Sequence, residues 1–182
     1  MHRPRVSLLC VTPICVRGFM AGLLVLATLG SPPSAAEISM ANDPKGFQAI
    51  PWGAPLAEFP NLVLVESNDR IKIYERKGGS ASLGEVPVEF MRLSTIDDKF
   101  ARVTVRYRGK DTHARLLMYL QSAYGPVDRT PESMMRGLNQ EFHWRGAETE
   151  VSLVYDGHRE RGHVFIESRT LAPNFLEAVG GG

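Results

Sequence analysis

Hydrophobic and polar residues alternate with a period of two along much of the chain after residue 60. Alternation of this kind is typical of strands that bury one face, and short connections between them favour antiparallel pairing. The strand candidates are 62–66, 70–75, 86–90, 101–107, 140–144, 150–156 and 163–168. The sequence therefore predicts an antiparallel sheet of about six or seven strands, which is a usual size for a sheet.

The best-defined strand pair surrounds Asp97 and Asp98. A two-residue turn at these aspartates would place Phe90 opposite Val105 on an apolar face. It would place Glu89 opposite Arg106 on the polar face, and such cross-strand partners stabilise a sheet. Asp-Asp is a poorer turn pair than Asn-Gly, so the register could also shift.

One segment has a helical period. Apolar residues recur at spacings of three and four between Leu116 and Tyr124, Asp111 can cap the start, and Gly125 and Pro126 end the run. The apolar stripe is as wide as expected for a helix that lies on a sheet. One main helix, at about 111–124, packed on an antiparallel sheet gives the α+β class.

Residues 1–36 have the order of a secretory signal peptide. A basic stretch without acids, 1–17, precedes an uncharged run at 19–29, and a Gly/Pro break leads to small residues up to Ala36. The alternative is an uncleaved membrane anchor, which needs about 20 apolar residues. Because Arg17 interrupts the run that would supply them, we expect cleavage after Ala36. The mature protein would then be periplasmic or secreted, with no transmembrane span.

Cleavage changes the composition. The whole chain is 43% hydrophobic and 23% charged with a formal charge of +1, which excludes a disordered chain. Cleavage removes three arginines and no acid, which leaves 18 basic against 20 acidic residues and a charge of −2. Cys10 and Cys15 also leave, so a disulfide scaffold and a thiol nucleophile are excluded.

The expected parts are a signal peptide (1–36), a flexible lead-in (37–46), a single α+β domain (47–170) and a flexible tail (171–182).

Three short features together resemble those of a known group. They are Phe47-x-x-Ile50-x-Trp52-Gly53, a helix ending in Tyr124-Gly125-Pro126, and Phe142-x-Trp144 in a later strand. They resemble a broad group of small exported bacterial proteins of unknown function, which open with F-x-x-I/L-x-W-G and carry a helix ending in Y-G-x-P or a variant. The resemblance implies export and an α+β fold, and it implies no catalytic residue.

The densest cluster of potential metal ligands lies at 156–163. Its candidate ligands are His158, Glu160 and His163, since imidazole and carboxylate suit zinc or a similar ion. Their spacing matches no standard metal motif, and two arginines lie among them, so a polar hairpin tip explains the composition equally well. We expect no metal and no cofactor. Among the other histidines, His143 should be a half-exposed strand residue, and His113 should lie at the surface.

A basic stretch offers the best candidate for a partner surface. Arg102, Arg106 and Arg108 alternate with apolar residues and should share one sheet face. Such a row could receive lipid headgroups, a polysaccharide or an acidic protein patch. The alternative is a solvated face neutralised by Glu89 and other acids. Trp52 could also anchor a partner, although such a residue more often packs in the core.

No nucleophile elbow, phosphate-binding loop or dinucleotide fingerprint occurs in the sequence. We therefore expect a non-enzymatic periplasmic or secreted module that binds a protein or envelope component. The alternatives are a small exported hydrolase or metal-dependent enzyme, and a carrier of a small apolar ligand between helix and sheet. Nucleic acid is not an expected partner for an exported chain of this charge. The sequence does not set the oligomeric state.

Overall fold

The structure, a computed structural model of the 182-residue chain, describes residues 40–127 and 139–180. The expected signal peptide lies outside these residues. Within them, no helix combines the length and the apolar character that crossing a membrane requires.

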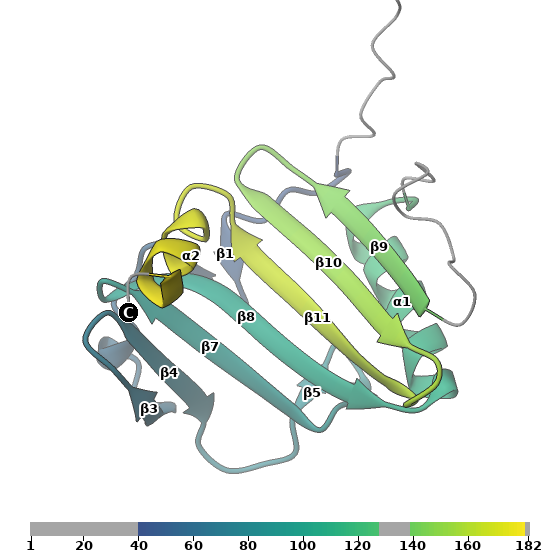
Figure 1. Ribbon diagram of the computed structural model, residues 1–182, viewed down its shortest axis with the longest axis horizontal. Helices are drawn as coiled ribbons and strands as arrows, with labels where there is room; N and C mark the ends of the chain where they lie inside the picture. Colours follow the sequence, from purple (N-terminus) through teal and green to yellow (C-terminus); the bar gives the residue numbers. More distant parts are fainter. Residues whose placement is uncertain (1–39, 128–138, 181–182) are drawn as a thin grey trace, which may run out of the picture. The chain divides into compact units, whose positions relative to one another are not determined.

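Seven antiparallel strands form the main sheet, in the order β3-β4-β7-β8-β11-β10-β9 (Figure 1). Their bounds are β3 (Leu62–Ser67), β4 (Ile71–Arg76), β7 (Phe90–Ile96), β8 (Lys99–Arg108), β9 (Asn139–Arg145), β10 (Thr149–Asp156) and β11 (Arg161–Ser168). The smaller elements are β1 (Gly46–Phe47), β2 (Ile50–Pro51), η1 (Leu56–Glu58), β5 (Ser82–Leu83), β6 (Val86–Pro87), α1 (Lys110–Tyr124) and α2 (Pro173–Gly180). The α+β prediction, with one main helix on an antiparallel sheet, is confirmed.

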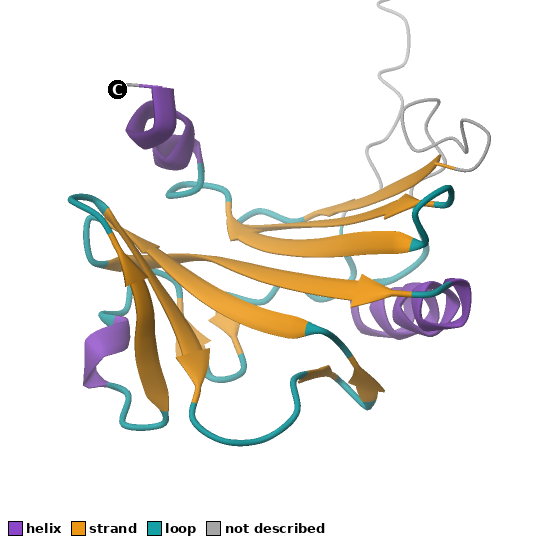
Figure 2. Ribbon diagram, turned by 60° about the horizontal axis from the view of Figure 1, so that its bottom comes forward, coloured by secondary structure: helices purple, strands orange, loops and turns teal. Residues whose placement is uncertain are grey.

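The two faces of the sheet are covered differently. Figure 2 shows α1 and η1 on one side of the sheet and α2 on the other. We call the side of α1 the inner face and the opposite side the outer face. On the inner face, Val103, Val105 and Tyr107 of β8 and Leu116 and Leu120 of α1 have no exposed surface. Full burial of an aliphatic side chain contributes about 1.5–3 kcal/mol, so this layer supplies most of the stabilisation.

The turn between β7 and β8 is the one predicted, but the register beyond it differs. Asp97 and Asp98 have φ of 48° and 63°, the left-handed pair that a tight hairpin turn requires. Next to the turn the pairing follows the prediction, and then a bulge shifts it by one residue between Ser94 and Thr95. Phe90 therefore pairs with Arg106 instead of Val105, and the predicted register is wrong there. A shift of one residue moves a side chain to the opposite face, so Phe90 lies on the outer face.

The bulge also divides strand β8 between two cores. Phe100 belongs to the inner core, whereas Ala101 packs with Ile96 and Phe175 in a second cluster on the outer face. Phe175 comes from α2 and is only 5% exposed. Within the expected tail, Pro173–Gly180 thus form a helix that has a second, small core on which to pack.

The expected flexible lead-in is also ordered from residue 40 onward. Met40 is buried in the inner core, and its N–H donates to the carbonyl of Arg145 at 3.1 Å. The carboxylate of Asp43 accepts the backbone N–H groups of Glu148 and Thr149, at 2.8 and 3.1 Å. These contacts fix the segment against the turn between β9 and β10.

Candidate functional site

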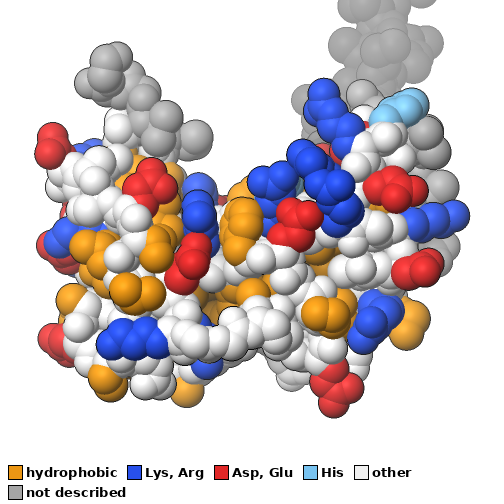
Figure 3. Space-filling model, turned by 90° about the horizontal axis from the view of Figure 1, so that it is seen from below, with side chains coloured by type: hydrophobic (Ala, Val, Ile, Leu, Met, Phe, Trp, Pro, Cys, Tyr) orange, Lys and Arg blue, Asp and Glu red, His pale blue; other side chains and the backbone are white. Residues whose placement is uncertain are grey.

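The outer face carries a group of cations that we call the arginine surface. Figure 3 shows Lys and Arg side chains gathered on one flank of a hollow in this face, with acidic and hydrophobic side chains beside them. As alternation predicts, Arg102, Arg106 and Arg108 point to the face opposite the buried Val103, Val105 and Tyr107. The arginine surface comprises Phe90, Arg92, Arg102, Arg106, Arg108 and Arg161, from β7, β8 and β11.

Arg102 is held in place by internal contacts. Its guanidinium donates from Nε to Glu167 across the strand pair and lies 4.3 Å from the ring centre of Phe175. Its side chain is 28% exposed. Arg102 therefore fixes α2 to the sheet, and this end of the arginine surface has a structural role.

Arg106 and Arg108 share one carboxylate. Arg106 Nε lies 3.0 Å from Glu89 Oε2, and Arg108 Nε donates to Glu89 Oε1 at 3.2 Å. The predicted neutralisation by Glu89 is therefore present, but one acid serves two guanidinium groups. Arg108 is the more exposed of the two, at 54% of its side chain.

Phe90 is the apolar centre of the arginine surface. The guanidinium carbons of Arg92 and Arg106 lie 4.8 and 5.9 Å from its ring centre, within the range of cation–π attraction. Arg92 also donates from Nε to Glu75 at 2.8 Å. The sequence prediction missed Phe90, because the bulge that moves it to this face was not foreseen.

At the end away from α2, like charges meet. Arg161 of β11 is exposed and lies directly opposite Arg108 of β8. Among the described residues, no carboxylate forms an ion pair with Arg161. His163 lies opposite Arg106, and burial together with the Arg106 charge lowers its pKa, although Glu89 acts in the other direction. Like charges directly opposite each other destabilise a sheet. Asp156 of β10 lies opposite Arg161 on its other side and balances part of this charge, and the remaining positive charge favours an added anion.

The candidate metal ligands do not come together. His158 and Glu160 are exposed in the turn between β10 and β11, whereas the His163 ring stacks on Phe165 at 5.9 Å. Asp156 Oδ1 accepts the N–H groups of His158 and Arg159 and so shapes the turn. Across the residues that the structure describes, no three His, Cys, Asp or Glu side chains are grouped as a metal site would require.

Trp52, the other candidate partner residue, packs inward. Its ring centre lies 4.8 Å from that of the buried Phe100, and its Nε1–H donates to Thr149 Oγ1 at 3.0 Å. Both the apolar and the polar part of the side chain are thus engaged within the fold. This supports the core-packing alternative.

His113, expected at the surface, is buried, and that expectation is wrong. It is 4% exposed, its ring stacks on Tyr155 at 4.4 Å, and burial lowers its pKa. Its two ring nitrogens lie 2.7 Å from Tyr107 Oη and 3.1 Å from Gln140 Oε1. A histidine with both nitrogens engaged in this way is compatible with the core.

The structure brings together a serine, a histidine and an acid that sequence spacing did not indicate. On the outer face, Nδ1 of His143 lies 3.1 Å from Ser152 Oγ, and Nε2 lies 3.0 Å from Glu141 Oε1. The order resembles that of a nucleophile, a base and an orienting acid. Acyl transfer also needs donors for the oxyanion. Ser152 lies in a strand paired on both sides, so the ladders use the backbone N–H groups around it.

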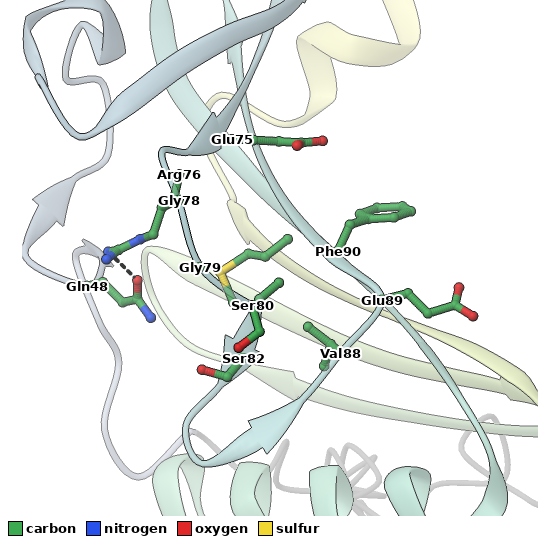
Figure 4. A pocket seen from close by; sticks show the side chains of 12 residues that line it. Gln48, Glu75, Arg76, Gly78, Gly79, Ser80, Ser82, Val88, Glu89 and Phe90 are labelled. Carbon is green, nitrogen blue, oxygen red and sulfur yellow. Dashed lines mark hydrogen bonds between the residues drawn. The ribbon is translucent and has the colours of Figure 1, made fainter.

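A polar pocket of about 530 Å³ lies beside the loop between β4 and β5 (Figure 4). Gly78 and Gly79 have φ of 64° and 106°, which lets the loop turn sharply around the pocket. On the opposite side, Arg76 donates to Gln48 Oε1 at 2.5 Å. Glu89 and Phe90 also line this pocket, so it borders the arginine surface.

Comparison of the chain with models of protein families, with curated proteins and with solved structures gave no match. The resemblance to small exported bacterial proteins therefore stays a prediction.

Proposed function

We propose that the protein is a non-enzymatic periplasmic or secreted module that binds an anionic protein or envelope component through the arginine surface. One observation carries the proposal: Arg108 and Arg161 lie directly opposite each other, and Glu89, the acid that pairs with Arg108, is shared with Arg106. A carboxylate, phosphate or sulfate group of a partner would relieve this repulsion and accept hydrogen bonds from both arginines.

The shape of the site supports a large partner. The arginine surface spans three strands of an open sheet face, whereas small-molecule sites are enclosed and mostly apolar. Phe90, with guanidinium groups beside its ring, adds an apolar contact of the kind found at the centre of protein interfaces.

The test is a charge reversal with a matched control. Arg108→Glu with Arg161→Glu removes the proposed contact, while Lys45→Glu with Lys77→Glu makes the same change in net charge elsewhere on the surface. The probes are vesicles of phosphatidylglycerol and phosphatidylcholine, vesicles of phosphatidylcholine alone, and envelope proteins recovered by chemical cross-linking.

We expect the unchanged protein to bind the anionic vesicles or an acidic protein in a manner that salt weakens, because screening reduces such contacts. The arginine pair should lose at least tenfold in affinity, and the lysine pair should change little. Equal effects of the two pairs, with both variants folded by circular dichroism, would rule the arginine surface out as the binding site.

The carrier alternative receives less support. It requires space between α1 and the sheet, but Leu116 and Leu120 on the inner side of the helix are fully buried in the core. Mass spectrometry of gently purified protein tests it directly, since a carrier would retain its ligand.

A further inference from the structure

Strand β3 exposes apolar side chains at one edge of the main sheet (Figure 1). Among the described residues, four large hydrophobic side chains are exposed, and three of them are consecutive in β3: Val63 at 42%, Leu64 at 49% and Val65 at 44%. An exposed apolar edge is a template for another strand, and most proteins cover or charge such edges. The fourth, Met118, lies on α1.

The backbone of β3 has free pairing groups toward the open side. The N–H of Lys77 donates to the carbonyl of Asn61 at 2.8 Å, and bonding pairs alternate along an antiparallel ladder. Asn61 and Val63 therefore bond to β4, whereas the N–H and C=O groups of Leu62 and Leu64 point away from it. The carbonyl of Phe59 accepts the N–H of Leu62. Three backbone groups therefore remain for pairing on the open side, namely the C=O of Leu62 and the N–H and C=O of Leu64.

The regular edge is short. A bulge interrupts the β3–β4 register between Leu64 and Glu66, and bulges limit further pairing at an edge. An occupant must therefore match a few residues around Val63. At the other edge of the sheet, the N–H of Met40 already reaches the carbonyl of Arg145 in β9.

We propose that the occupant is a second copy of this chain, paired antiparallel through β3 about a two-fold axis at Val63. In this register Val63 lies opposite Val63, and Leu62 of each copy lies opposite Leu64 of the other. The N–H of each Leu64 then donates to the Leu62 carbonyl of the other copy. Glu66, the only charged residue of β3, lies opposite Pro60, so no like charges are juxtaposed.

This interface is independent of the proposed function, because β3 contributes no residue to the arginine surface. A two-fold axis that relates adjacent antiparallel strands keeps equivalent faces on the same side. The dimer would therefore present both arginine surfaces in one direction.

The experiment is sedimentation equilibrium over a range of protein concentrations. We expect a reversible dimer for the unchanged protein and for Met118→Lys, which places the same charge at the exposed apolar residue away from the edge. Leu64→Lys should be monomeric at every concentration while it keeps the circular dichroism spectrum and thermal midpoint of a folded protein.

A cross-linking test fixes the register. In a chain with Cys10→Ser and Cys15→Ser, Val63→Cys should form an interchain disulfide on mild oxidation, because two copies of residue 63 would face each other. Met118→Cys, although more exposed, should not. A monomeric unchanged protein, a dimeric Leu64→Lys variant, or equal cross-linking of the two cysteines would each overturn the proposal.

Discussion

The phenol oxygen of Tyr107 lies 2.7 Å from Nδ1 of His113 in the core beneath α1. Gln140 presents Oε1 to Nε2 at 3.1 Å, and the Tyr107 hydroxyl also donates to the carbonyl of Val154 at 3.2 Å. Burial raises the pKa of Tyr107 and lowers that of His113, so both groups are neutral in the folded protein. This network links β8, α1 and β9 without any charge.

The first prediction concerns acid sensitivity. His113 has a lowered pKa when folded and a value near 6.5 when unfolded, so the unfolded chain binds the proton first. Its contribution to stability is complete above about pH 6.5 and declines as the pH falls toward the folded pKa, by at most about 1.4 kcal/mol per pH unit. Urea unfolding at about pH 7.5 and about pH 5.5 measures the difference.

The pKa of His163 is also lowered in the folded protein, so a variant at His163 supplies the comparison. His113→Gln should flatten the pH dependence in this window, whereas His163→Gln should leave the part due to His113 in place. A His113→Gln variant with the full pH dependence of the unchanged protein would show that the buried network is not its source.

The second prediction concerns Gly162, which lies opposite Tyr107 on β8 and opposite Tyr155 on β10. A Cβ at this position would overlap the Tyr107 ring and lie 2.6 Å from the carbonyl oxygen of Val154. Gly162→Ala should therefore destabilise the protein by about 1–3 kcal/mol or more, as overpacked cores do. Thermal or urea unfolding measures the loss.

The matched comparison is Gly162→Ala in a Tyr107→Leu background, where the shorter side chain lacks the ring atoms that the methyl group would meet. In that background Gly162→Ala should lower the free energy of unfolding by less, although the contact with the Val154 carbonyl should keep the loss above zero. An alanine that costs the same in both backgrounds would mean that the tyrosine ring is not what requires glycine.

The third prediction is that the Ser152 hydroxyl is no more nucleophilic than that of an ordinary serine. His143 and Glu141 are placed to accept and stabilise its proton, but the ladders on both sides of β10 leave no pair of free N–H groups for an oxyanion. A fluorophosphonate probe should label the unchanged protein no faster than the Ser152→Ala variant. Labelling that depends on Ser152 and His143 would instead support the hydrolase alternative.

Much of the fold could be predicted because each strand has a local signal. The alternation at β8, β10 and β11 and the helical period of α1 follow directly from which face each residue buries. The Asp97-Asp98 turn was also predicted, but not the bulge after it. One sequence sign of the bulge is Phe100, which is out of phase with Val103, Val105 and Tyr107, since residues an odd number of positions apart in a regular strand lie on opposite faces.

The residues that were missed depend on partners elsewhere in the fold. His113 is buried because its ring nitrogens form hydrogen bonds with Tyr107 and with Gln140, which is 27 residues away. The α2 helix exists because Ile96 and Ala101 form a cluster on the outer face that its Phe175 can cover. The repulsion between Arg108 and Arg161 depends on the β8–β11 register, which no local pattern encodes.

That register also sets an order of folding. The strands β3, β4, β7 and β8 neighbour each other in chain order, as do β9, β10 and β11, whereas the β8–β11 seam joins residues as far apart as Arg102 and Glu167, 65 positions. Closing a long loop costs more entropy than forming a hairpin, so we expect the two groups of strands to form first and the seam last. Arg108 comes from one group and Arg161 from the other. Their repulsion therefore acts only in the final step, because the two arginines come together only when the seam closes.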